Sequence, residues 1–218
     1  MTQLGEFFKK HKEIIIMSCL TILCIVSALF VTEKPDGKEL TKGQIDAVNT
    51  HFEQLIPMQD SSEFEYMVNP ICHFFSSDYD DVSEIDMGEF VYYIPRESYL
   101  TEDDTKEIAK LQEAGFCLPF GKIEDSPIPF GRVPYETVES YLHRYANVNL
   151  ADMKNMGGAI YSDEYQCFYT YTSDFGPGHF RCIGGRVEGD MVTLDSETAV
   201  LKLKRDKDRY YILSHRQK

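Results

Sequence analysis

Apolar and polar residues are distributed unevenly along the chain, and the strongest signal lies near the amino terminus. Residues 14–31, IIIMSCLTILCIVSALFV, form an 18-residue run without a charge, and Lys9, Lys10 and Lys12 precede it. A run of this length predicts a single membrane-spanning helix that anchors the chain. It exceeds the roughly 7–15 residues of a typical signal-peptide core, although the small residues at 26–28 leave cleavage as the alternative.

The orientation of this anchor follows from the lengths of chain on its two sides. A short head, residues 1–13, stays in the cytosol more readily than the long polar segment that follows the span. Residues 32–40, TEKPDGKEL, combine proline, glycine and alternating charge, and they predict a flexible linker. The remainder, residues 41–218, is predicted to be one extracytoplasmic domain. The sequence therefore predicts a single-pass protein of the cell membrane with its C-terminal domain outside.

The first half of this domain has helical periodicity. Apolar residues recur at intervals of three and four, and capping or helix-stopping residues flank each such segment. The segments between them, 58–85 and 117–134, lack this pattern and are predicted to be loops. Four helices are predicted: one capped by Thr41 that stops at Pro57, one from Asp86 to Pro95, one capped by Thr101 that stops at Gly115, and one that starts near Pro134.

After Gly157 and Gly158 the spacing changes from helical to alternating. Short segments that alternate apolar and polar residues, separated by turn-forming residues, are typical of antiparallel strands in series. Helices followed by strands indicate an α+β fold in which the helices pack on an antiparallel β-meander sheet. The predicted strands cover residues 159–162, 165–172, 179–187, 191–194, 199–204 and 209–215.

The net charge of −14 narrows the range of partners and sites. An acidic surface repels phosphate backbones, so no nucleic acid partner is expected. Acidic residues are densest from Asp78 to Asp86, where oxygen ligands would suit calcium. A solvated loop with a helix cap explains the same residues, and the EF-hand spacing is missing. The sequence has no catalytic, cofactor or zinc motif, so we assign no catalytic residue, cofactor or metal.

Four cysteines follow the predicted anchor, and an oxidising compartment favours disulfides between them. A hairpin centred on residues 174–175 would set Cys167 and Cys182 directly opposite each other, within disulfide distance. Cys167–Cys182 is therefore the favoured pair, and Cys72–Cys117 is the second. Buried free thiols are the competing interpretation.

Tyrosines supply the main functional hint. Tyr169, Tyr171, Tyr210 and Tyr211 fall on the predicted sheet, where a tyrosine-lined face can receive a peptide or a glycan. The competing interpretation places these residues beneath the helices, in the core. The absence of tryptophan argues against a module that stacks on sugars.

The order of five segments carries a resemblance to a known group of proteins. They read NPICHFF, DYDDVSEIDMGEFVYYI, LTEDDTKEIAKLQEAGF, VPYETVESYLHRYANVNLADM, and the alternating stretch that starts at YQCFYTYTSDFG. From about residue 60 onward the chain resembles uncharacterised extracytoplasmic proteins of Gram-positive bacteria that an N-terminal span or lipid tethers to the membrane. The resemblance implies an envelope location. No catalytic residues have been assigned in that group, so the resemblance transfers none, and the four outer cysteines depart from the group. The NTF2-like fold, helices followed by a curved sheet, is a looser analogy that does not carry function.

These patterns together predict a membrane-anchored extracytoplasmic domain that acts by binding, with a protein or peptide of the cell envelope as its partner. The alternative is an envelope hydrolase that uses a Cys-His pair or carboxylates. A hydrolase should show a cleft in which titratable groups converge, whereas a binding module should show a shallow tyrosine-rich face.

Overall fold

The computed structural model describes residues 37–218 except for 55, 60–64, 116–122, 126–129, 172–177 and 208. Within these residues the fold is α+β, with antiparallel sheets and helices, as the sequence predicts. No helix in this part of the chain is long and apolar enough to cross a membrane. The predicted span 14–31, the head 1–13 and most of the linker lie outside the described residues.

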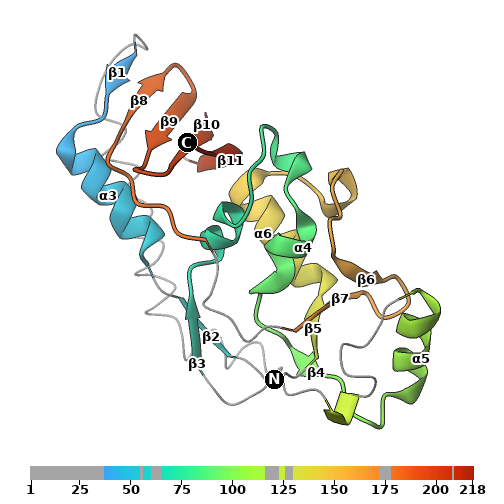
Figure 1. Cartoon of the computed structure of the whole chain (residues 1–218). Helices are drawn as coiled ribbons and strands as arrows, with labels where there is room; N and C mark the ends of the chain where they lie inside the picture. The colour runs from blue at the N-terminus through green and yellow to red at the C-terminus, as the bar shows by residue number, and fades with distance from the viewer. Residues whose placement is uncertain are drawn as a thin grey trace, which may run out of the picture.

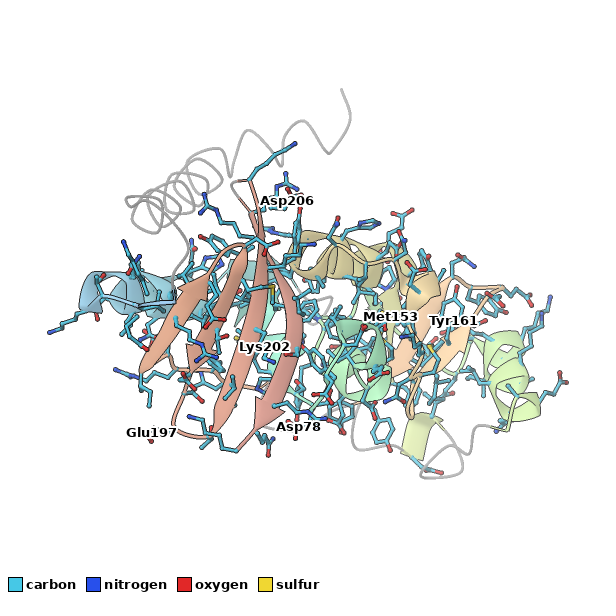
Figure 2. The ribbon with its side chains drawn as sticks, turned by 90° about the horizontal axis from the view of Figure 1, so that it is seen from above. Asp78, Met153, Tyr161, Glu197, Lys202 and Asp206 are labelled. Atoms are coloured by element: carbon cyan, nitrogen blue, oxygen red, sulfur yellow. The ribbon has the colours of Figure 1, made fainter. Side chains whose placement is uncertain are left out.

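A five-stranded sheet contains most of the predicted meander. Its strand order is β1-β8-β9-β10-β11, and every pair is antiparallel. Along β10 the buried Leu201 and Leu203 alternate with the exposed Lys202 and Lys204, so one face joins the core and the other meets solvent. Figure 2 shows this sheet with Lys202 on it and with Glu197 and Asp206 at its two ends. Its strands are β1 (Lys38–Glu39), β8 (Gly184–Glu188), β9 (Met191–Asp195), β10 (Ala199–Asp206) and β11 (Arg209–Gln217).

The remaining predicted strands belong to a separate four-stranded sheet, so the expectation of one continuous meander was wrong. Its order is β4-β5-β7-β6, and β7 pairs with β5 on one edge and with β6 on the other. Because both edges of β7 are occupied, the chain after it crosses to the other sheet instead of forming a hairpin. The strands are β4 (Ser98–Tyr99), β5 (Gly131–Pro134), β6 (Ile160–Ser162) and β7 (Cys167–Thr170).

The first helix, α3 (Lys42–Phe52), begins as predicted and ends early. Thr41 and Gln44 form a reciprocal capping box at its start. At its end, the side-chain amide of Asn69 donates to the carbonyls of His51 and Phe52 at 2.7 and 3.0 Å, which satisfies groups that a longer helix would use. The predicted stop at Pro57 was wrong, because this residue lies in a two-stranded ribbon of β2 (Ile56–Gln59) and β3 (Glu65–Val68).

Three further helices match the predicted positions more closely. Asp86 caps α4 (Met87–Tyr92), since its carboxylate accepts the Glu89 amide at 3.1 Å. The helix α5 (Thr105–Glu113) starts later than predicted, because Thr101 donates both its amide and its hydroxyl to Asp104 instead of capping. The helix α6 covers Tyr135–Ala146, and four short 3-10 helices cover η1 (Pro70–Phe75), η2 (Val82–Glu84), η3 (Ile123–Asp125) and η4 (Leu150–Asp152).

Two clusters of buried side chains hold these elements together. The larger cluster joins both sheets through α4, α6 and η1, and Phe74, Phe90 and Phe168 are among its fully buried members. Figure 1 shows α4 and α6 between the five-stranded sheet and the four-stranded sheet, with α5 at the far end of the latter. The smaller cluster contains Leu111 and Tyr169 and lies under α5. The four-stranded sheet therefore has α4 on one face and α5 on the other.

Candidate functional site

A groove of about 400 Å³ runs between α4 and the end of the four-stranded sheet where β6 and β7 meet. This volume falls in the range of clefts that hold small ligands or peptide side chains. Residues from three segments line it, and they are mainly small or aromatic with two carboxylates. They are Asp86, Gly88, Glu89, Val91 and Tyr92 from α4, Gly158, Ala159 and Ile160 before and in β6, and Tyr169, Thr170 and Tyr171 from the end of β7.

Two glycines and a helix cap bring the start of α4 against the segment before β6. Gly157 has a φ of +51°, and a Cβ atom there would lie 2.1 Å from the Asp86 carboxylate that caps α4. A Cβ atom on Gly88 would lie 2.9 Å from the Gly158 amide nitrogen, so the helix rests directly on the backbone of the segment before β6. Backbone bonds fasten the same segment: the Met87 amide donates to the Asn155 carbonyl at 3.1 Å.

Two aromatic residues of the lining, Tyr92 and Tyr171, belong to a row of packed rings. The Tyr171 ring stacks on Phe130 with centroids 5.2 Å apart, and it meets Tyr92 edge-on at 6.5 Å. Tyr92 in turn packs edge-on against Tyr93 at 5.0 Å. Tyr92 and Tyr171 are half-buried, so each ring keeps part of its surface open to a ligand. Rings held this way offer contact area with little loss of side-chain entropy on binding.

The Thr170 hydroxyl is the most unusual polar group in the lining. Thr170 is only 4% exposed, and its Oγ1 atom is buried without a hydrogen-bond partner. A buried hydroxyl left unpaired destabilises the fold by roughly 1–3 kcal/mol. Such groups are rare in native proteins and need a structural or functional reason.

The four tyrosines predicted to form a binding face lie in two different sheets. Tyr169 is buried on the α5 face, where its hydroxyl donates to the buried Glu107 carboxylate at 2.5 Å. Tyr210 and Tyr211 belong to β11 of the other sheet, and Tyr210 packs against the main core. Only Tyr171 is both partly exposed and in the groove. Alternation along the chain identified residues on strands, but it carries no information about which strands share a sheet.

The predicted disulfides are absent. Cys72, Cys167 and Cys182 are free, and Cys117 lies outside the described residues. The Cys167–Cys182 prediction was wrong because β7 is paired on both edges, whereas Cys182 lies beside α3. There the Cys182 amide donates to the Asn49 side chain at 2.8 Å, and Asn49 returns a bond to the Cys182 carbonyl at 2.9 Å.

The described cysteines, and the histidine next to Cys72, lack the properties of a catalytic pair. Burial raises the pKa of Cys72 to about 11, and burial also raises the pKa of Cys167 and of Cys182. Each thiol is therefore protonated at neutral pH, whereas a nucleophilic cysteine needs a lowered pKa. His73, next to Cys72, is completely buried, and this burial lowers its pKa to about 3. The Cys-His version of the hydrolase alternative has no support among these residues.

The acidic segment from Asp78 to Asp86 serves structural bonds. Asp80 forms a two-point ion pair with Arg216, which lowers the pKa of Asp80. Asp81 caps η2 through the Ser83 amide and hydroxyl, at 2.8 and 2.6 Å. Within the described part of the chain, no group of three or more His, Cys, Asp or Glu residues is placed to hold a metal ion.

Sequence reasoning missed the groove itself. Gly157 and Gly158 lie in the segment beside the groove, but in the sequence they indicate only a boundary between the predicted helices and strands. The Asp86 cap was found, yet its contact with Gly157 depends on two segments that are distant in the chain. No family model, curated protein or solved structure matches this chain, so the site is defined by its own geometry.

Proposed function

We propose that this chain is a membrane-anchored extracytoplasmic domain that binds a protein or peptide partner of the cell envelope in the groove between α4 and β7. The observation that carries the proposal is the groove, whose lining contains the half-buried Tyr92 and Tyr171 and also Thr170, a residue with a buried, unpartnered hydroxyl. The apolar run at 14–31 supports the anchor, and the acidic surface supports a partner other than nucleic acid.

An extended peptide suits this groove for two reasons. The strand β6 forms one edge of its sheet, so one side of its backbone has no neighbouring strand among the described residues. Open strand edges bind extended peptides through backbone hydrogen bonds, while adjacent pockets take alternate side chains. Glu89 is exposed and lines the groove together with the half-buried Tyr92 and Tyr171, so the lining offers both charged and aromatic contacts.

Site-specific photocrosslinking of the full-length protein in intact cells tests the proposal. A photoreactive residue at Tyr92 should form an adduct with a partner, whereas one at Lys202, on the distant sheet, should not (Figure 2). Gly158→Phe is the blocking variant, because a side chain at Gly158 meets nothing within 4 Å and the residue lines the groove. Gly43→Phe, at an equally open position on α3, is its control.

The expected result is an adduct from Tyr92 that Gly158→Phe abolishes and Gly43→Phe preserves. Adducts of equal yield from Tyr92 and Lys202, or an adduct that persists with Gly158→Phe, would overturn the groove as the binding site. A Lys202→Cys thiol tests the location independently. A membrane-impermeant maleimide should label it in intact cells, and labelling only after lysis would overturn the extracytoplasmic placement.

A further inference from the structure

One row of residues crosses the four-stranded sheet on the face covered by α4. In the strand register Gly131 of β5 lies opposite Tyr99 of β4 and opposite Thr170 of β7. Residues directly opposite each other in antiparallel strands point to the same face. Two positions along β7, Phe168 belongs to the main core together with Phe90 of α4, which identifies this face.

Arg96 occupies the space that a side chain at Gly131 would fill. A Cβ atom on Gly131 would lie 2.2 Å from Cδ and 2.4 Å from Cγ of Arg96. The aliphatic stem of Arg96 therefore lies on the Gly131 backbone, in the row between Tyr99 and Thr170. Its guanidinium carbon lies 5.8 Å from the centroid of the Tyr99 ring, which favours the cation by a cation–π contact.

Among the described residues, the guanidinium of the partly exposed Arg96 has no anionic partner. Its Nε and Nη1 atoms are buried without a hydrogen-bond acceptor, and no carboxylate of the described residues lies within ion-pair distance. The neighbouring Thr170 Oγ1 is likewise buried and unpartnered. Buried charges are normally paired, because desolvation without compensation is strongly unfavourable.

Arg132, on the opposite face of the same sheet, shows how this chain pairs an arginine for structure. Its Nε and Nη2 atoms donate to the two Glu107 oxygens at 2.8 and 2.7 Å. Asp104 at 2.9 Å and the Tyr99 carbonyl at 3.1 Å complete its shell. Arg132, one residue after Gly131, is therefore fully paired. On the α4 face, by contrast, Arg96 and Thr170 carry buried polar atoms without partners.

We propose that Arg96 and Thr170 form a carboxylate-binding subsite that receives an acidic side chain or the C-terminal carboxylate of the bound peptide. Thr170 lines the groove, and Arg96 lies behind this lining on Gly131, the residue opposite Thr170 in the strand register. The Arg96 guanidinium carries the charge opposite to that of a carboxylate. Its unpartnered Nε and Nη1 groups point to different sides of the guanidinium, so a carboxylate meets one of them, and the threonine hydroxyl can donate a further bond. The identity of the ligand rests on the proposed peptide-binding function, while the anion subsite is a property of these residues.

Titration of the full-length protein in detergent micelles with sodium acetate tests the subsite without knowledge of the partner. Acetate replaces sodium chloride at constant ionic strength, and NMR follows the arginine Nε–Hε resonances. We expect one resonance to shift saturably with acetate and to be missing in Arg96→Met, a variant that retains an apolar stem. Arg96→Lys should bind more weakly, and Arg186→Met, which removes an exposed arginine paired with Glu188, should bind as the wild type.

Thr170→Val separates a binding role from a structural one. Because the hydroxyl has no partner, its removal should leave the melting temperature unchanged or raise it. The same change should weaken acetate binding by about 3- to 10-fold, the effect of one lost hydrogen bond. A Thr170→Val protein that is destabilised and binds acetate normally would show that the hydroxyl is structural, and the subsite would then be wrong.

Further outcomes distinguish a carboxylate from a phosphate, a terminal carboxylate from a side-chain one, and failure of the subsite from failure of the peptide-binding function. Inorganic phosphate that saturates the Arg96 resonance at tenfold lower concentration than acetate would overturn the assignment to a carboxylate. Peptides tested with a free and an amidated C-terminus tell a terminal carboxylate from a side-chain one. No saturable acetate shift together with a crosslink that Gly158→Phe abolishes would refute the subsite alone. Acetate binding without such a crosslink would refute the peptide function and leave the anion subsite standing.

Discussion

His73 should make the stability of this domain strongly dependent on pH. The side chain is completely buried in η1, and neither ring nitrogen has a hydrogen-bond partner. The imidazole lies between the Phe90 ring, edge-on at 6.0 Å, and the Tyr141 ring, stacked at 5.8 Å. A protonated ring in this apolar site would be an uncompensated charge, and burial accordingly lowers the pKa of His73 from 6.5 to about 3.

The sign of the effect follows from comparing the two states. Between pH 6.5 and about 3 the unfolded chain binds a proton at His73, whereas the folded chain does not. Acid therefore favours the unfolded state, and the free energy of unfolding falls by up to about 1.4 kcal/mol for each pH unit in this window. Across the whole window the loss from this one residue is about 5 kcal/mol, a large part of the stability of an ordinary domain.

Urea unfolding of the full-length protein in detergent, followed by the near-UV circular dichroism of tyrosine, measures this loss at pH 7, 6, 5 and 4. The His73→Phe variant keeps a ring in the site and cannot be protonated, so its stability should decline less between pH 6 and 4. Carboxylates that titrate in the same window cancel in the difference between the two proteins. Phe74→Leu, a neighbouring core change without a titratable group, should keep the wild-type slope. Equal slopes for the wild type and His73→Phe would refute this reasoning.

Three further predictions concern other buried contacts. Glu107→Gln should destabilise the domain by about 3 kcal/mol, because it leaves the partly buried Arg132 with a weaker partner. Lys110→Met breaks an exposed ion pair on the same helix and should change stability by less than about 1 kcal/mol. Urea unfolding compares the two variants, and equal losses would contradict the role of burial. Gly157→Ala should destabilise by about 2 kcal/mol or more, since it places a Cβ atom 2.1 Å from a carboxylate at a left-handed φ; unchanged thermal unfolding would contradict the contact. Cys72 should react with a maleimide at pH 8 at least about 100-fold more slowly in the folded protein than in urea, because burial raises the pKa of its thiol to about 11. Mass spectrometry of timed samples measures the ratio of the two rates, and equal rates would contradict burial of the thiol.

The sequence by itself determined the features that depend on neighbours in the chain. Thr41 and Asp86 mark the starts of α3 and α4 as predicted, because a helix cap is satisfied within one turn. Pro134 marks the start of α6 as predicted, without a side-chain capping bond, because the fixed φ of proline suits a helix start. The strands β8 to β11 form the predicted meander, because short turns leave each strand beside the next. The α+β class follows from these two local patterns.

Only the tertiary structure decided which distant segments meet. One of the two partners of β7 is β5, more than thirty residues earlier in the chain. With both edges of β7 occupied, the predicted disulfide is absent and the tyrosines are divided between two sheets. The side chain of Asn69, a residue outside α3, binds the carbonyl of His51 at the end of this helix. The side chain of Arg96, from the segment between α4 and β4, fills the space beside Gly131. Alternation and helical spacing record which side of an element is apolar, but they do not record which other element covers it. That choice is made by packing across the whole domain, and it alone brought the unpaired Arg96 and Thr170 together.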